Sequence, residues 1–252
     1  MILLTLMLMA APPEGVTAGP MAGDRSRYNA CLALAKSAPE RAIETAQAWR
    51  IENGGTGAVH CLALAQFQRK DYTAAFRSFE AAAQASQRAG DGQAVVLLSQ
   101  GADAALLAGQ PEAAVKFLGE AIDGAGTAIS PRVEAALRVT RAEALVDLKR
   151  DKEAAADLDR ATAIDGQVAD GWLLKATLAR RMGDLKTAEA AILAAAGQSP
   201  DSAEVQYEAG NIAAAQGNME LAKTAWTAAA SAGADSMAGA AAAKALQAAA
   251  RP

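Results

Sequence analysis

The second half of the chain repeats a pattern of small, large apolar and turn-forming residues every 34 positions. Three consecutive blocks align without gaps, and their equivalent positions are Ala142, Ala176 and Gly210; Leu158, Ile192 and Trp226; and Ala161, Ala195 and Ala229. Within a block, the small and large apolar residues of the second segment are three or four positions apart, so they share one helix face. The pattern therefore predicts repeated amphipathic helices.

Each block predicts two helices joined by a tight turn. In the second of the three blocks, Trp172 to Met182 predicts the first helix and Leu185 to Ala196 predicts the second. Gly183 and Asp184 lie between them, and glycine favours the positive φ that often follows a helix end. We expect the small residue of each first helix to let a side chain of a neighbouring helix pack closely.

This pattern resembles the tetratricopeptide repeat (TPR), a helix–turn–helix unit of the same length. The family expects Trp, Gly or Ala, Gly, Ala, Ala and Pro where this chain has Trp172, Ala176, Gly183, Ala188, Ala195 and Pro200. The resemblance implies an all-α fold, a right-handed α-solenoid built of stacked helical hairpins, and a role in protein–protein interaction. Inference from fold to function is by analogy.

The same pattern extends toward the N-terminus in a looser form. Ala30 to Ala35 repeats almost letter for letter as His60 to Ala65, and Gly109-Gln110-Pro111 marks another turn. We expect a linker over residues 19–26 and a solenoid over 27–252 with about six repeats and a C-terminal capping helix. The predicted repeats are 27–55, 56–89, 95–128, 135–168, 169–202 and 203–236, and the predicted capping helix is 237–251.

The N-terminal segment has a different character. Met1 to Met9 is an uncharged apolar run that is too short to span a bilayer, which takes roughly 20 residues, but it fits the apolar region of a secretory signal peptide. Ala10 and Ala18 offer cleavage points, although no basic residue precedes Arg25. We expect residues 1–18 to be a signal peptide and the protein to be periplasmic or secreted. An apolar extension on a cytoplasmic protein is the alternative.

Composition supports helices and excludes several classes of function. More than a quarter of the residues are alanine, 52% are apolar and only 4% are aromatic. Alanine has the strongest helix propensity, and this apolar content is too high for a disordered chain. The net charge of −4 lacks the basic footprint of a nucleic-acid-binding protein. We therefore expect no nucleic-acid partner, and no membrane-spanning segment in the mature chain.

The residues that often carry chemistry are few. The single histidine, His60, excludes sites with two histidine ligands, and it does not face its neighbour Cys61 on a helix. We place no catalytic arrangement, metal site or cofactor, and expect no enzyme activity. Cys31 and Cys61 occupy equivalent places in successive repeats, so an exported protein could bridge them; two buried free thiols are the alternative.

The TPR resemblance also implies a binding groove along the exposed face of the first helices. Carried over residue by residue, the candidate lining is Leu64, Phe67, Asp103, Glu143, Asp170, Thr177, Arg180, Arg181, Tyr207 and Asn211. Tyr207 stands where some family members have a carboxylate-binding lysine, so we predict no carboxylate clamp. The large residues Trp49, Trp172 and Trp226 are expected to pack in the interior.

Together these features predict a non-catalytic scaffold that binds a protein or peptide partner in the cell envelope. Two alternatives stay open. One is a receptor or regulatory subunit with a small-ligand or glycan pocket in the groove, and the other is a TPR assembly scaffold in the cytoplasm. The sequence does not name the partner.

Overall fold

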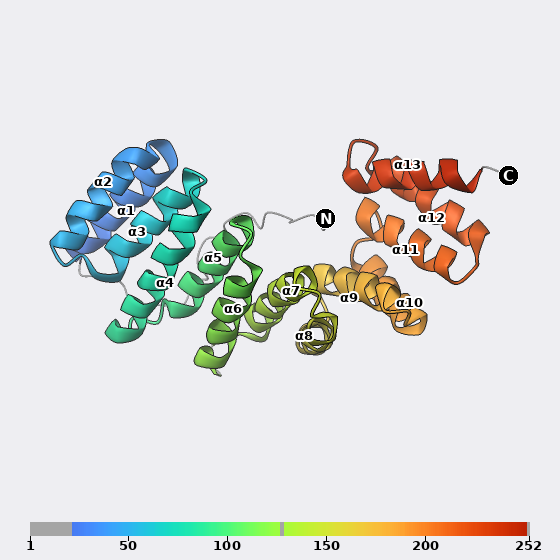
Figure 1. Ribbon diagram of the computed structural model, residues 1–252, viewed down its shortest axis with the longest axis horizontal. Helices are drawn as coiled ribbons and strands as arrows, with labels where there is room; N and C mark the ends of the chain where they lie inside the picture. Colours follow the sequence, from blue (N-terminus) through green and yellow to red (C-terminus); the bar gives the residue numbers. More distant parts are fainter. Residues whose placement is uncertain (1–21, 127–128, 251–252) are drawn as a thin grey trace. The chain divides into compact units, whose positions relative to one another are not determined.

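The computed structural model describes residues 22–126 and 129–250, and within these residues all regular structure is helical. The helices follow one another as antiparallel pairs joined by short turns (Figure 1). This arrangement confirms the predicted all-α helical-repeat solenoid. The chain divides into two compact units, residues 1–126 and 127–252, each of which is described by itself.

The N-terminal unit contains three helical hairpins. Its helices are α1 (Ala22–Ser37), α2 (Pro39–Ile51), α3 (Gly55–Gln68), α4 (Tyr72–Ala89), α5 (Ala94–Leu107) and α6 (Pro111–Ala125). Each helix packs on the next, and α1 also packs on α3. We call α1, α3 and α5 the first helices of this unit, and α2, α4 and α6 its second helices.

The C-terminal unit contains three further hairpins and one terminal helix. Its helices are α7 (Pro131–Asp147), α8 (Asp151–Ile164), α9 (Ala169–Arg181), α10 (Leu185–Gln198), α11 (Ala203–Ala215), α12 (Met219–Ala232) and α13 (Met237–Ala249). The first helices α7, α9 and α11 pack side by side in this order, and α13 packs on α11 and α12. We call the surface of the first helices that points away from the second helices the inner face of each unit.

The turns within the hairpins follow the predicted chemistry. Gly183 and Gly217 have φ values of 82° and 83°, in the left-handed region that glycine adopts without steric cost. The next residue caps the second helix in both hairpins. The Asp184 carboxylate accepts the Thr187 amide hydrogen, and the Asn218 side chain accepts the Leu221 amide hydrogen.

The small residues lie where large side chains come close, as expected. Trp226 is 7% exposed, and a Cβ atom at Gly210 would overlap its indole ring. Ala176, Ala188 and Ala195 form one core cluster with Ile192. Of the other tryptophans, Trp49 is buried and Trp172 packs half-buried against this cluster.

Three boundaries differ from the sequence-based expectation. The helix α1 begins at Ala22, so residues 22–26 are helical and do not belong to the expected linker; Asp24 in its first turn favours the helix N-terminus. The helix α7 begins at Pro131, earlier than expected, because Ser130 caps it. The helix α13 ends at Ala249, before residue 251, where the expected capping helix ends. The expected signal peptide, residues 1–18, lies outside the described residues.

Candidate functional site

The contact between the first helices of the N-terminal unit is organised around the buried His60 on α3. In the neutral ring, Nε2 donates a hydrogen bond to Gln100 Oε1 at 2.8 Å, and Nδ1 accepts one from the Tyr28 hydroxyl at 2.6 Å. These bonds join α1, α3 and α5. Phe79 of α4 packs against the ring, with centroids 5.9 Å apart. The buried His60 side chain therefore connects the first helices. It belongs to no group of possible metal ligands among the described residues.

Burial makes His60 a source of pH-dependent stability. Desolvation lowers the pKa of its imidazole from 6.5 to about 4. Between these pH values the unfolded chain binds a proton that the folded chain does not bind. The contribution of the neutral His60 side chain to the free energy of unfolding is therefore fully present above pH 6.5, and it is lost as the pH falls. We expect acidification to pH 4 to lower the free energy of unfolding through His60 by about 3 kcal/mol.

Urea denaturation at several pH values, with the His60→Gln variant as control, measures this contribution. Glutamine keeps hydrogen-bonding groups but does not titrate. The stability difference between the two proteins should shrink or change sign as the pH falls from 6.5 to 4. A difference that is the same at all pH values would contradict the role given to His60.

Cys31 and Cys61 are joined by a disulfide that ties α1 to α3. Their Cα atoms are 6.1 Å apart, within the range that a bridge requires, and both side chains are buried. Cys61 is next to His60, so the bridge and the Tyr28–His60 hydrogen bond fasten the same two helices. The equivalent positions of the two cysteines in successive repeats explain this proximity.

The predicted groove residues of the N-terminal unit differ in their surroundings. Leu64 is buried. Phe67 is half-buried, and its ring packs edge-on against Tyr72 with the ring centroids 5.3 Å apart. Asp103 on α5 is exposed to solvent, and no described residue forms a hydrogen bond or ion pair with it. The surrounding protein partly desolvates this carboxylate and raises its pKa to about 6.

In the C-terminal unit, several predicted groove residues bind one another or neighbouring helices. Arg180 on α9 donates two hydrogen bonds to the buried Glu208 on α11, at 2.6 and 3.2 Å. The amide of Asn211 also donates to Glu208, and its oxygen accepts a hydrogen bond from the Trp226 indole at 3.1 Å. Arg180 and Asn211 therefore join α9, α11 and α12.

The remaining groove candidates of this unit lie along the same first helices. Thr177 donates a hydrogen bond to the Leu173 carbonyl, and Arg181 pairs with Asp151 at 3.6 Å. Tyr207 is half-buried against the core cluster that contains Trp226. The side chain of Glu143 is half-buried, and that of Asp170 is exposed.

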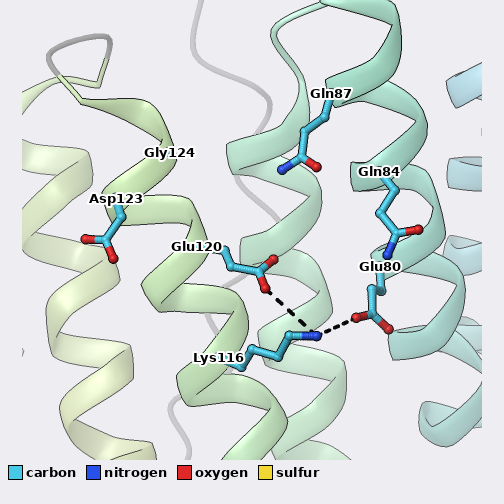
Figure 2. A pocket seen from close by; sticks show the side chains of 7 residues that line it. All are labelled: Glu80, Gln84, Gln87, Lys116, Glu120, Asp123 and Gly124. Carbon is cyan, nitrogen blue, oxygen red and sulfur yellow. Dashed lines mark hydrogen bonds and ion pairs between the residues drawn. The ribbon is translucent and has the colours of Figure 1, made fainter.

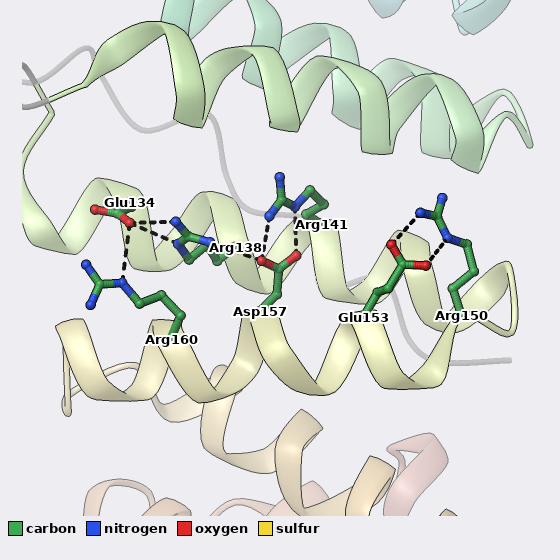
Figure 3. A network of polar contacts seen from close by, with 7 residues as sticks. All are labelled: Glu134, Arg138, Arg141, Arg150, Glu153, Asp157 and Arg160. Atoms are coloured by element: carbon green, nitrogen blue, oxygen red, sulfur yellow. Dashed lines mark hydrogen bonds and ion pairs between the residues drawn. The ribbon is translucent and has the colours of Figure 1, made fainter.

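A buried carboxylate network also fastens α7 to α8 (Figure 3). Asp157 is 5% exposed, and Arg141 donates two hydrogen bonds to it at 2.6 and 2.7 Å. Arg138 contacts the same carboxylate at 3.2 Å and pairs with Glu134 at 2.9 Å. No sequence motif indicates this group, because its members come from two helices and no short spacing reveals their contact.

A hollow of about 660 Å³ lies between the second helices α4 and α6 (Figure 2). Lys116 reaches across it and pairs with Glu80 at 2.8 Å and Glu120 at 3.8 Å. Gln84, Gln87, Asp123 and Gly124 complete the lining. The hollow is polar and is formed by residues outside the predicted groove.

Comparison with known proteins identifies the fold. No family model and no curated protein matches the sequence. PilW, described as a widely conserved type IV pilus biogenesis factor, matches with a TM-score of 0.68 and 14% identity over 88% of this chain and 99% of its own. Pseudomonas aeruginosa PilF has a TM-score of 0.66 and 14% identity, over 90% and 99% of the two chains.

The neighbour with the most informative description is YrrB, "a TPR protein with an unusual peptide-binding site". It matches with a TM-score of 0.58 and 19% identity over 79% of this chain and 96% of its own. The chain has the TPR fold. At this level of identity the likeness shows the TPR fold alone, so the roles of individual residues rest on the contacts of this chain. No helix among the described residues has the length and apolarity needed to cross a bilayer.

Proposed function

We propose that this protein is a non-catalytic scaffold that binds a protein or peptide on the inner face of its first helices. The observation that carries the proposal is the TPR fold, shared with a neighbour described as having a peptide-binding site. Stacked hairpins present a surface along which an extended or helical segment can lie. Phe67 and Asp103 supply apolar and polar contacts in the N-terminal unit, and Tyr207 and Asp170 supply them in the C-terminal unit.

Site-specific photo-crosslinking tests this function. A benzophenone amino acid replaces Phe67 on α3 or Tyr207 on α11, and, as a matched control, Leu193, which is 66% exposed on the second helix α10. The proposal expects polypeptide adducts from at least one inner-face position, with a partner that the purified wild-type chain also binds. Adducts from the α10 position alone, or no adducts at all, would contradict it.

We further propose that the protein is exported to the cell envelope. The Cys31–Cys61 bridge supports this location, because structural disulfides persist in oxidising compartments. The apolar run at Met1 to Met9 also fits a cleaved signal. The intact mass of the native chain from fractionated cells tests the proposal. A bridged chain without its N-terminal segment supports it, and a chain that keeps Met1 and two free thiols contradicts it.

A further inference from the structure

The first helices α3 and α5 of the N-terminal unit together contain only one residue of the types Lys, Arg, Asp and Glu. The helix α3 (Gly55–Gln68) contains no Lys, Arg, Asp or Glu, and α5 (Ala94–Leu107) contains only Asp103. The histidine of α3 is buried, and its low pKa keeps it neutral near pH 7. Any charge that α3 and α5 present to a partner is therefore the charge of Asp103.

Asp103 lies at the centre of the exposed arc of α5. Leu97, Leu98, Ala102, Ala104 and Ala105 are buried on the opposite side of this helix. Val96, Ser99, Gln100, Leu106 and Leu107 are half-buried, and they lie one or two turns from Asp103 on its own side. The carboxylate thus projects from a surface that Leu106 and Leu107 make apolar on its C-terminal side.

The helix α3 extends this apolar surface. The hydrogen bond between His60 on α3 and Gln100 on α5 places these two residues at the same height along the two helices. Both helices run in the same direction. Leu64 follows His60 by one turn, as Asp103 follows Gln100, so these two residues lie at a similar level. Phe67 follows Leu64 by nearly one more turn. Of these two residues on α3, Leu64 is buried and Phe67 is half-buried, so Phe67 is the one that adds apolar surface on this side of the unit.

The packed elements supply no counter-charge to Asp103. The charged residues of the helices that pack on α5 are Arg77, Glu80, Arg88, Glu112, Lys116, Glu120 and Asp123. No described member of this set forms an ion pair or hydrogen bond with Asp103, and Lys116 binds Glu80 and Glu120 instead. By contrast, the buried Asp157 and Glu208 of the C-terminal unit have arginine partners. An unpaired carboxylate within an apolar surface is complementary to a cation with apolar flanks.

We propose that the inner face of the N-terminal unit binds a partner segment in which one Lys or Arg is flanked by apolar residues, and that Asp103 receives the cation. This inference rests on the proposed function and narrows its partner class. Desolvation raises the pKa of Asp103 to about 6, and a cation of the partner would stabilise the ionised carboxylate. Binding through Asp103 should therefore strengthen as the pH rises through about 6.

Selection from a displayed library of random peptides tests the proposal on the full chain. We expect enriched peptides to share a Lys or Arg next to apolar residues, and we expect Asp103→Asn to remove the preference for the cation. An enriched peptide, resynthesised with norleucine in place of its lysine, should bind the wild-type chain roughly tenfold more weakly. The affinity of the lysine peptide should fall between pH 7 and pH 5, and that of the norleucine peptide should not.

Matched variants distinguish the outcomes. Asp103→Glu should keep the cation preference, and so should Asp170→Asn, which removes an exposed carboxylate of the other unit. Enriched peptides without a cation, or with a preference that survives Asp103→Asn, would overturn this inference and leave the proposed function standing. Enrichment of no sequence would contradict both. Self-association that Asp103→Asn abolishes, without peptide binding, would make a second copy the occupant and overturn the proposal.

Discussion

Replacing Asp157 with alanine should lower the free energy of unfolding of the C-terminal unit by about 3–5 kcal/mol. The substitution removes the carboxylate that Arg138 and Arg141 share, and the side chains of these arginines are only 18% and 21% exposed. Two half-buried guanidinium groups would lose the carboxylate that they share, and this carboxylate offsets part of their desolvation. Removing one member of a buried ion pair leaves the other member buried without that partner. This costs more stability than replacing the whole pair with apolar residues.

Hydrogen exchange in α7 and α8 during urea denaturation measures this loss within the unit concerned. Asp159→Ala is the matched control, because Asp159 lies on the same helix and pairs with Lys175 at 2.8 Å but is 67% exposed. The control should change the free energy by less than about 1 kcal/mol. Equal effects of the two substitutions would show that the burial of Asp157 does not contribute to the stability of the unit.

Removing the disulfide should lower the free energy of unfolding of the N-terminal unit by about 3–4 kcal/mol in the chain-entropy model. The bridge closes a loop with a sequence separation of 30, and it joins α1 to α3 next to the Tyr28–His60 hydrogen bond. Without it the unfolded chain gains conformational freedom. The loss should appear as easier opening of α1, because this helix lies at one end of the described stack.

Urea denaturation with and without a thiol reductant measures the contribution of the bridge. The wild-type chain should unfold at a lower urea concentration after reduction, and thiol alkylation should verify that both cysteines are free. The double variant Cys31→Ala, Cys61→Ala is the control, and its unfolding should not respond to the reductant. Coincident curves for the bridged and reduced wild-type chains would contradict a stabilising disulfide.

The regular features of the fold could be predicted because they repeat. The spacing of Ala176, Gly183 and Ala188 predicted a helical hairpin. Cys31 and Cys61 occupy equivalent positions in successive repeats, which indicated that they could lie close together. These predictions depend on local periodicity and on the packing of identical units. The helix α1 begins earlier than predicted, and Asp24 in its first turn favours the helix N-terminus there.

The sequence does not show which polar residues of the predicted groove already have partners within the chain. Arg180 and Asn211 occupy groove positions, yet both are held by Glu208, which lies on a different helix from Arg180. No sequence pattern indicated that Asp157 is buried, since its burial depends on two arginines of the preceding helix. Asp103 stayed available because its neighbours on α3 and α5 carry no opposite charge.

Hydrogen exchange of the full chain with a selected lysine-containing peptide tests most directly whether the inner face of the first helices binds the partner. Saturating peptide should slow exchange in α3 and α5 of the wild-type chain, and the same peptide concentration should give less protection in the Asp103→Asn variant. Protection confined to α4 and α6, which line the hollow around Lys116, would contradict the account, as would protection confined to the C-terminal unit.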